Sequence, residues 1–296
     1  MALLRSYLFA PGNDEKLLDK VFAAGADAVV LDLEDAVPPA EKARARELVR
    51  RALTGRAPGS RPEAWVRINA LESQEWREDV EAAVGPALTG VRVPKADSAA
   101  GLGLLAEALA QAEAKRGLPA GSVAVACTIE SAAGVLAARE LAGGPRVRHL
   151  TFGAADYAAD VGADPGPLEL ETLAVRSHLV TASRAAGIDP PVASVFTRLD
   201  DEEGLRRGTE AARRLGFFGR SVIHPRQIAV VHEVFTPRPE EVRRAEELVK
   251  TFEAGTAAGS GALATPNGQF VDAAVARRAR AILELARSLA EREQVR

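Results

Sequence analysis

Two carboxylates that follow successive β-branched runs have the chemistry of a divalent-cation site. Glu130 ends the run 123–130, where alternation places it on the face of the small residues, opposite the bulky apolar face. A carboxylate on such an inner face is costly unless a cation lies beside it. Asp156 follows the next run, 149–152, after three small residues. Because Mg²⁺ binds one or two protein carboxylates and takes its other ligands from water and substrate, the pair predicts a magnesium site.

Each of these acids also has a structural alternative. Glu130 could form a salt bridge at a strand end, and Asp156 could cap the N-terminus of a helix. Zinc is disfavoured, because it prefers His or Cys ligands and the four histidines show no metal-ligand spacing.

A cation accompanies the acids in the run 64–69. Alternation places Arg67 with Trp65 and Asn69, on the face opposite the two aliphatic residues. An arginine on an inner face needs an anionic partner, and its planar fork suits a carboxylate. Two partners remain open. One is an internal acid, Asp32 or Glu34, and the other is a carboxylate of the substrate, which would make Arg67 a substrate-binding and catalytic residue.

Charged residues around these positions are expected to support the site. Asp32, Glu34 and Asp35 form an acidic cluster at the end of the second β-branched run, and Lys95 follows the fourth. We expect them to orient the metal's surroundings from outside its own ligands. A Schiff-base role for Lys95 is disfavoured, because a metal site makes it unnecessary.

Candidate substrate-binding residues are small or rigid. Gly153, Ala154 and Ala155 leave room for a compact ligand beside the metal, and Pro94 ends the fourth run. His224, at the end of the last run, is open between a packed strand-end residue and a ligand contact.

The elements that carry these residues alternate in a regular way. We expect helical segments at 13–24, 40–53, 98–114, 168–186 and 202–215. We expect strands at 6–10, 27–33, 64–69, 90–93, 123–129, 149–152, 192–196 and 221–223. Eight strands alternating with helices predict a TIM (β/α)₈ barrel, in which reacting groups lie at the carboxyl ends of the strands. The turn after the first strand is not GxGxxG, which argues against a doubly wound sheet.

The pattern changes after the last strand. Helices expected at 239–253 and 272–292 flank the segment 254–269, whose Gly, Ala, Ser and Thr content is typical of a flexible loop. We therefore expect a barrel domain over 1–235. A C-terminal helical extension over 236–296 would carry a lid segment and pack on a neighbouring subunit.

Composition excludes several function classes. A net charge of −3 without a clustered basic excess argues against nucleic-acid binding. No apolar run reaches the length of a membrane span, and the N-terminus reads as a first strand. The single cysteine, Cys127, forms no intrachain disulfide, which favours a cytoplasmic location.

An ordered set of motifs runs along nearly the whole chain. The matching pieces are 5–12 (RSYLFAPG), 27–37 (DAVVLDLEDAV), 66–69 (VRIN), 93–95 (VPK), 129–131 (IES), 152–157 (FGAADY) and 219–227 (GRSVIHPRQ). With them the chain resembles the citrate lyase β-subunit branch of the HpcH/HpaI aldolase superfamily, which includes malyl-CoA and citramalyl-CoA lyases.

The resemblance implies roles for particular residues. Glu130 and Asp156 would bind Mg²⁺, and Arg67 would grip a carboxylate of the keto acid. It also implies a catalytic aspartate near the C-terminus that reaches the site of a neighbouring subunit in a homotrimer. The similar position is Asp272, although many relatives follow it with a proline and this chain has Ala273.

The expected reaction is a magnesium-dependent Claisen-type cleavage of a citryl thioester to oxaloacetate and an acetyl thioester. The thioester partner would be coenzyme A or an acyl carrier protein. One alternative is a malyl-CoA or citramalyl-CoA lyase that releases glyoxylate or pyruvate, and another is a non-catalytic keto-acid-binding subunit. A class II aldolase is disfavoured, because no histidine falls early on the barrel mouth.

Overall fold

Seven strands form one curled parallel sheet with neighbours in the order β6-β5-β4-β3-β2-β1-β7. The strands are β1 (Ser6–Pro11), β2 (Ala28–Asp32), β3 (Glu63–Arg67), β4 (Leu88–Val93), β5 (Ala124–Ile129), β6 (Val147–Phe152) and β7 (Arg220–Val222). These seven bounds lie close to seven of the predicted strands. The structure is a computed structural model, and it describes residues 3–166, 169–257, 263–264 and 270–294.

A short segment closes this sheet between its two edge strands. Val192 bridges Thr151 of β6, and Ala193 bridges Arg220 of β7, both in parallel. The backbone N–H of Val192 donates to Leu150 O at 2.9 Å, and that of Ser221 donates to Ala193 O at 2.9 Å. The bridging segment therefore takes the place of the eighth strand, and the predicted TIM (β/α)₈ barrel is confirmed.

The seventh predicted strand, 192–196, is shorter than expected. Only its first two residues bridge the neighbouring strands. The Ser194 hydroxyl donates to Phe152 O at 2.7 Å, so a side chain occupies the acceptor that a ladder N–H would use. The strand pairing ends there for this reason.

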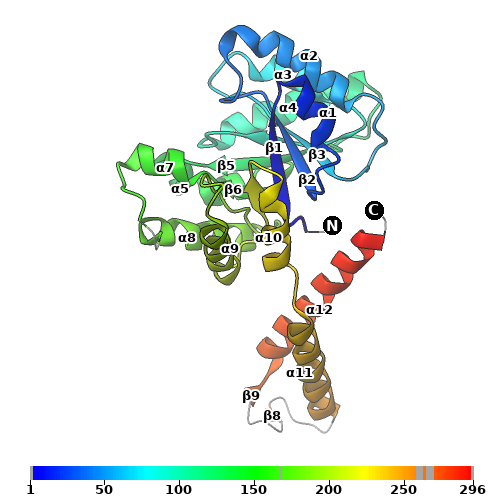
Figure 1. Cartoon of the computed structure of the whole chain (residues 1–296), viewed down its shortest axis with the longest axis vertical. Coiled ribbons are helices and arrows are strands. Elements are labelled where there is room, and N and C mark those ends of the chain that lie inside the picture. Colours follow the sequence, from blue (N-terminus) through cyan, green and yellow to red (C-terminus); the bar gives the residue numbers. More distant parts are fainter. Residues whose placement is uncertain (1–2, 167–168, 258–262, 265–269, 295–296) are drawn as a thin grey trace. The chain divides into compact units, whose positions relative to one another are not determined.

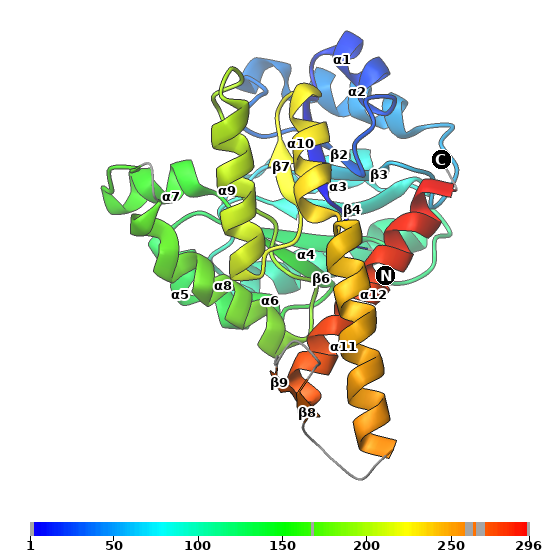
Figure 2. The same ribbon diagram turned by 60° about the horizontal axis from the view of Figure 1, so that its bottom comes forward.

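Helices surround the strands of the barrel (Figures 1 and 2). The regular helices are α1 (Glu15–Val21), α2 (Lys42–Leu53), α3 (Trp76–Ala83), α4 (Ala99–Lys115), α5 (Ala132–Leu136), α6 (Ala138–Ala142), α7 (Ala154–Val161), α8 (Leu173–Ala186), α9 (Glu202–Leu215) and α10 (Arg226–Phe235). Two 3₁₀ turns, η1 (Pro39–Glu41) and η2 (Leu170–Thr172), precede α2 and α8.

Side-chain caps fix where several helices begin. Asp14, Ser98 and Asp201 each accept a hydrogen bond from the backbone N–H three residues ahead, which satisfies a free donor of the first turn. Helix α9 occupies the predicted range. The helix predicted at 168–186 begins at Leu173, after η2, and Leu168 lies outside the described residues.

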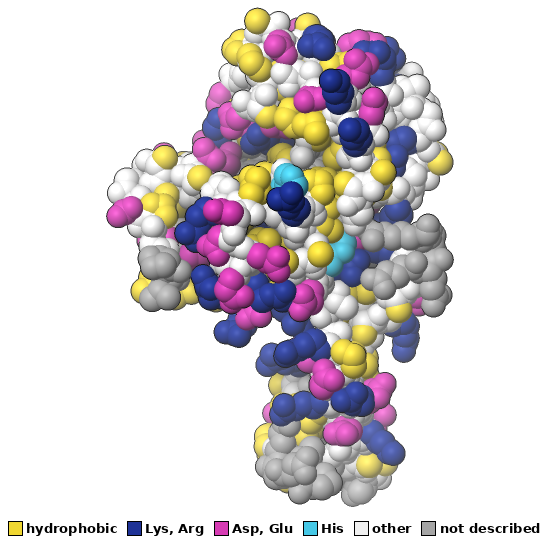
Figure 3. Space-filling view, viewed as in Figure 1, with side chains coloured by type: hydrophobic (Ala, Val, Ile, Leu, Met, Phe, Trp, Pro, Cys, Tyr) yellow, Lys and Arg dark blue, Asp and Glu magenta, His cyan; other side chains and the backbone are white. Residues whose placement is uncertain are grey.

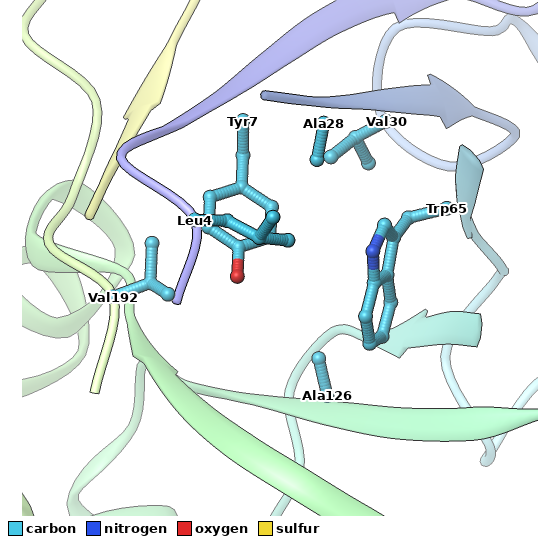
Figure 4. Close-up of a cluster of buried hydrophobic side chains, with 7 residues drawn as sticks. All are labelled: Leu4, Tyr7, Ala28, Val30, Trp65, Ala126 and Val192. Carbon is cyan, nitrogen blue, oxygen red and sulfur yellow. The ribbon is translucent and has the colours of Figure 1, made fainter. Parts of the chain in front are cut away.

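The interior of the barrel is plugged at the amino ends of the strands. Figure 4 shows the buried side chains of Leu4, Tyr7, Trp65, Ala126 and Val192 converging from different strands. The Tyr7 and Trp65 rings meet edge to face, with centroids 6.4 Å apart. This plug makes the amino end a packed core, so any reaction must take place at the other end.

The chain divides into two compact units, one of which is Leu4–His232 and contains the barrel. The other unit, from Glu233 onward, contains the helices α11 (Pro239–Ala257) and α12 (Ala273–Gln294), which lie side by side (Figure 1). Between them, β8 (Leu263–Ala264) and β9 (Phe270–Val271) pair antiparallel. Most of the predicted loop, residues 258–262 and 265–269, lies outside the described part of the chain, and the expected lid lies there with it.

The surface and the helices agree with a chain of balanced charge. On the face drawn in Figure 3, acidic and basic side chains are interspersed. Among the described residues, no helix combines the length and hydropathy needed to cross a membrane.

Candidate active site

Glu130 follows β5 at the carboxyl end of the barrel and is buried there, with 6% of its surface exposed. Its Oε1 accepts a hydrogen bond from the backbone N–H of Lys95 at 2.7 Å. The pKa of Glu130 is raised to about 7, chiefly by burial and also by the negative charges of Asp156 and Glu34, while the hydrogen bond from Lys95 opposes the shift. Within the described residues no ion pair joins Glu130 to a cation.

Gly153 packs its backbone directly against this carboxylate. A Cβ placed at Gly153 would lie 2.4 Å from Glu130 Oε2 and 2.6 Å from Glu130 Cβ, and both distances are steric collisions. The position therefore excludes a side chain as long as Glu130 keeps this conformation. Gly153 is also the N-cap residue of α7.

Asp156 lies in the first turn of α7 and is exposed. The predicted alternative that it caps the helix is wrong, because the N-cap residue is Gly153 and makes no side-chain hydrogen bond. An acid at this position is favoured by the positive end of the helix dipole. Its charge lies close enough to raise the pKa of Glu130, so the two carboxylates share one electrostatic environment.

This pair suits a hard cation with few protein ligands. No group of three or more His, Cys, Asp or Glu side chains positioned for a metal occurs in the described residues, which is unlike a zinc site. Mg²⁺ needs only one or two carboxylates and space for water and substrate. A buried carboxylate without a cation, beside an exposed one, provides that combination.

Arg67 ends β3 and makes a bidentate pair with Asp32. Its Nε lies 2.7 Å from Asp32 Oδ1, its Nη2 lies 2.6 Å from Asp32 Oδ2, and its Nη1 lies 2.7 Å from Glu34 Oε2. Burial alone lowers the pKa of Arg67, but Asp32 and Glu34 outweigh it and hold the pKa above its usual value. The internal partners left open by the sequence are therefore present.

Internal pairing does not close Arg67 to a ligand. The Arg67 side chain keeps 18% of its surface exposed, whereas Asp32 keeps 2%. Guanidinium carries five N–H donors, and the hydrogen bonds to Asp32 occupy two of them, while the contact with Glu34 is an ion pair. The acids orient the fork, and its remaining donors can meet a substrate carboxylate.

Lys95 connects the acidic cluster to Glu130. Its φ of 48° is a left-handed backbone conformation that non-glycine residues rarely adopt. In this conformation the Lys95 backbone N–H reaches Glu130, while Nζ lies 3.0 Å from Glu34 Oε1 and 3.8 Å from Asp35 Oδ1. The hydrogen bond to Glu34 raises the pKa of Lys95, so the side chain stays charged.

Glu34 is the least exposed member of this charged cluster after Asp32. Burial raises the pKa of Glu34, and the charges of Arg67 and Lys95 oppose that shift. Lys42, which the sequence did not single out, donates from Nζ to Leu33 O at 2.6 Å and to Glu34 O at 2.7 Å. Its amino group therefore fixes the loop that carries the acids.

Arg92 of β4 is a second arginine inside the barrel, and the sequence reading missed it. Its Nε donates to Thr128 Oγ1 at 3.2 Å and its Nη1 donates to Ser221 Oγ at 3.1 Å. Burial and the charge of Arg67 lower the pKa of Arg92 to about 10. The alternation of Arg92 with Val91 and Val93 was the available signal.

Two residues do not join the cluster as the alternation suggested. Asn69 lies beyond the end of β3, and its amide donates to Leu33 O at 3.0 Å and to Asp79 Oδ2 of α3 at 2.7 Å. Strand alternation stops at Arg67, so it does not apply to Asn69. His224 Nδ1 accepts from the backbone N–H of Arg226 at 3.1 Å.

The remaining predicted residues occupy two places. Pro94 is buried at the end of β4, and Ala154 and Ala155 begin α7, where the Ala154 N–H donates to Ser194 Oγ at 2.9 Å. Asp272 belongs to the other unit and caps α12. Its Oδ1 accepts from the backbone N–H groups of Ala274 and Val275, each at 2.9 Å.

A family model and individual known proteins that resemble this chain indicate the same family. Residues 5–225 match the family model described as HpcH/HpaI aldolase/citrate lyase. Citrate lyase subunit beta of Leuconostoc mesenteroides subsp. cremoris is 38% identical over 96% of this chain and 93% of that protein.

Two solved structures from Mycobacterium tuberculosis are also similar. Protein CitE in complex with magnesium, acetoacetate and coenzyme A has a TM-score of 0.77 at 31% identity, covering 96% of this chain and 98% of that one. Citrate lyase beta subunit complexed with oxaloacetate and magnesium has a TM-score of 0.67 at 32% identity, covering 80% and 98%.

Proposed function

The chain belongs to the HpcH/HpaI aldolase/citrate lyase family, and from that premise we propose that it is a magnesium-dependent carbon–carbon lyase. The substrate is a citryl thioester, and the products are oxaloacetate and an acetyl thioester. The observation that carries the proposal is the buried Glu130, whose pKa is raised to about 7 and which forms no ion pair in the described chain. The relatives bound to magnesium and oxaloacetate support the choice of cation and keto acid.

Glu130 and Asp156 hold the ion. When bound, Mg²⁺ acts as a Lewis acid on the carbonyl that forms as the carbon–carbon bond breaks. Gly153 leaves room for the Glu130 carboxylate, because any Cβ at that position would collide with it. The raised pKa of Glu130 means that ion binding must displace a proton at lower pH.

Arg67 binds a carboxylate of the keto acid. Asp32 and Glu34 hold its guanidinium in a fixed orientation, and Lys95 and Asp35 complete the charge balance around it. A fixed fork loses little freedom when a substrate carboxylate arrives, which favours correct orientation for reaction.

The backbone around these side chains completes the pocket. Pro94, Gly153, Ala154 and Ala155 lie at the carboxyl ends of β4 and β6 and present little side-chain bulk. They leave space for a compact keto acid next to the two carboxylates.

Asp272 is the general base, supplied by a neighbouring subunit of a homotrimer. It accepts the proton of the substrate hydroxyl as the carbon–carbon bond breaks and the electron pair moves into the acetyl-thioester enolate. Its Oδ1 caps α12, and Oδ2 has no hydrogen bond among the described residues. We place the reaction in the cytoplasm, with coenzyme A or an acyl carrier protein as the thioester partner.

The test is turnover of defined thioesters. The purified protein is incubated with citryl-CoA, malyl-CoA and citramalyl-CoA, with and without Mg²⁺, and keto acid release is followed. Magnesium-dependent release of oxaloacetate from citryl-CoA, absent in Glu130→Gln, supports the proposal. Release of glyoxylate or pyruvate instead identifies the malyl-CoA or citramalyl-CoA alternative. Release that does not depend on magnesium contradicts the proposed metal site.

The base is tested separately with Asp272→Asn and Asp272→Ala. Asn caps a helix as well as Asp does, whereas Ala does not. Loss of turnover in both variants, with the unfolding temperature lowered only in Asp272→Ala, assigns the base to Asp272. Full turnover in Asp272→Asn leaves the residue only its role as a helix cap.

A further inference from the structure

Arg92 is a buried cation that no carboxylate neutralises. It keeps 5% of its surface exposed, and the described residues provide it no ion pair. Its side-chain hydrogen-bond partners among the described residues, the hydroxyls of Thr128 and Ser221, are neutral. Of the other buried arginines of the barrel, Arg220 of β7 likewise has no ion pair among the described residues, whereas others have acidic partners. Arg148, for instance, pairs with Glu63 at 2.8 Å and with Asp189 at 3.1 Å.

The position of Arg92 makes this lack of a partner more costly. In the register of β3 and β4, Arg92 lies directly opposite Arg67. Both guanidinium groups lie over the ring of Phe9, at 5.4 Å for Arg67 and 4.9 Å for Arg92. Like charges on one face destabilise a sheet, and Asp32 and Glu34 compensate only Arg67.

Hydroxyl groups surround Arg92 in place of acids. Thr151 stands opposite Thr128 in the register of β5 and β6, so the two share the inner face. The Thr151 hydroxyl is buried and has no hydrogen-bond partner within the described chain. Together Arg92, Thr128, Thr151 and Ser221 form a polar, positively charged cluster inside the barrel, in which Arg92 stands level with Arg67. We call these four residues the Arg92 cluster.

A buried positive charge near one unpaired hydroxyl, that of Thr151, suits a small anion. Arg92 uses two of its five N–H donors on Thr128 and Ser221, which leaves donors for a bidentate contact with a carboxylate. Glu130 is near enough to bear on the charge of Arg92, so an anion held here would also lie close to the proposed metal.

We propose that Arg92 binds the second carboxylate of the keto acid and thereby selects a dicarboxylic keto acid, such as oxaloacetate, over a monocarboxylic one, such as pyruvate. The inference rests on the proposed function and deepens it. Arg67 binds one carboxylate of the ligand, and the Arg92 cluster binds the other. A pyruvate leaves Arg92 buried and unpaired, which is the physical basis of the discrimination.

The experiment compares magnesium-dependent binding of freshly prepared oxaloacetate and of pyruvate by calorimetry. The variants are Arg92→Met, Arg92→Lys and, as matched control, Arg148→Met. We expect wild type to prefer oxaloacetate by roughly 100-fold or more, because an ionic hydrogen-bonding group is left unpaired with pyruvate. Arg92→Met reduces the preference to a few-fold, Arg92→Lys restores part of it, and Arg148→Met leaves it unchanged.

Thermal unfolding tests whether Arg92 has a structural role, because loss of such a role would lower the unfolding temperature. Removing an unpaired buried cation is neutral or stabilising, so Arg92→Met unfolds at the wild-type temperature or above. Arg148→Met unfolds at a lower temperature, because it leaves Glu63 and Asp189 without their cation. An unchanged oxaloacetate preference in a destabilised Arg92→Met protein overturns the inference alone. Failure of wild type to bind either keto acid overturns the proposed function as well.

Discussion

At the amino end of the barrel, the buried carboxylate of Asp27 meets an opposite charge within the chain, whereas at the carboxyl end Glu130 and Arg92 form no ion pair with the described residues. Arg5 holds Asp27 with Nε 2.9 Å from Oδ2. Burial alone raises the pKa of Asp27, but Arg5 and His232 outweigh it and lower the pKa to about 2. At the other end the pKa of Glu130 is raised to about 7 and that of Arg92 is lowered to about 10, both chiefly by burial.

The difference separates stability from function within one fold. Both ends take charges out of water, and only an opposite charge offsets that loss of hydration. The Arg5–Asp27 pair offsets it during folding. Glu130 acts on the charge of Arg92, but neither forms an ion pair among the described residues, so binding of a cation and an anion relieves a cost that folding left in place.

The strongest way to break this comparison is to neutralise one carboxylate at each end. Glu130→Gln should lower turnover by about 1,000-fold, the scale of removing a group that stabilises charge in a transition state. It should leave the unfolding temperature unchanged or higher, because the buried charge is gone. Keto acid release and thermal unfolding measure the two effects.

Asp27→Asn should behave in the opposite way. It removes the partner of buried Arg5, which costs about 3–5 kcal/mol of unfolding free energy, while turnover of the folded fraction stays near wild type. Urea unfolding measures the loss. A destabilised Glu130→Gln, or a stable Asp27→Asn, would show that the two ends do not differ as described.

Two glycines sharpen the comparison sterically. A Cβ at Gly153 collides with Glu130, and a Cβ at Gly90 lies 2.5 Å from the Trp65 ring in the plug. Gly153→Ala should lower turnover by about 10- to 100-fold through displacement of the proposed metal ligand. Gly90→Ala should instead lower the unfolding free energy by about 1–3 kcal/mol through overpacking.

Turnover and urea unfolding of both glycine variants distinguish these effects. Equal loss of activity in the two variants, at equal stability, would contradict the division between the ends.

Stability as a function of pH should also distinguish the ends. Glu130 keeps its proton to about pH 7 in the fold but only to about 4.5 when unfolded, so its contribution to stability is lost as pH rises between these values. Asp27 acts in the opposite direction, since its contribution is present above pH 3.8 and lost as pH falls through about 2.

Thermal unfolding of the metal-free protein from pH 5 to 8 measures this dependence. We expect the Glu130→Gln protein to lose less stability over that range than wild type does. Below pH 7 the apparent affinity of wild type for Mg²⁺ should fall about tenfold per pH unit, because the ion must displace the Glu130 proton. Parallel curves for both proteins would place the titration elsewhere.

The smallest expected effect comes from Lys95→Met. Half of the Lys95 side chain is exposed, so solvent screens its pair with Glu34, and the loss should not exceed about 1 kcal/mol of unfolding free energy. Urea unfolding measures it beside Arg148→Met, whose ion pairs are buried at the amino end. A Lys95→Met loss as large as that of Arg148→Met would mean that the carboxyl end is built for stability as well.

Much of the fold followed from periodicity. Each of the eight predicted β-branched runs contributes a strand or a bridging segment to the barrel. A strand that is buried on both faces needs a continuous apolar run of that length. The exception, 194–196, left the sheet through a hydrogen bond of the Ser194 side chain. Alternation along the chain does not show when a side chain takes a backbone hydrogen-bond acceptor. It also failed at Asn69, which lies beyond the end of its strand and binds through its side-chain amide.

Part of the candidate site could also be predicted from the positions of the strand ends. Reacting groups of a barrel gather at the carboxyl ends of its strands, and the structure brings Asp32, Arg67, Glu130 and Asp156 into one charged cluster there. Arg92 was missed because a strand arginine gives no sign in the sequence of whether an acid will pair with it. Only its contacts with Thr128 and Ser221 show that none does.

The sequence by itself therefore determined the barrel, its family and the residues that stand at the strand ends. The tertiary structure decided which acid orients Arg67, that Gly153 and not Asp156 caps α7, and that Glu130 and Arg92 form no ion pair among the described residues. The physical reason is that periodicity is a property of neighbours along the chain. Pairing, desolvation and pKa depend on charges brought together across space from distant strands.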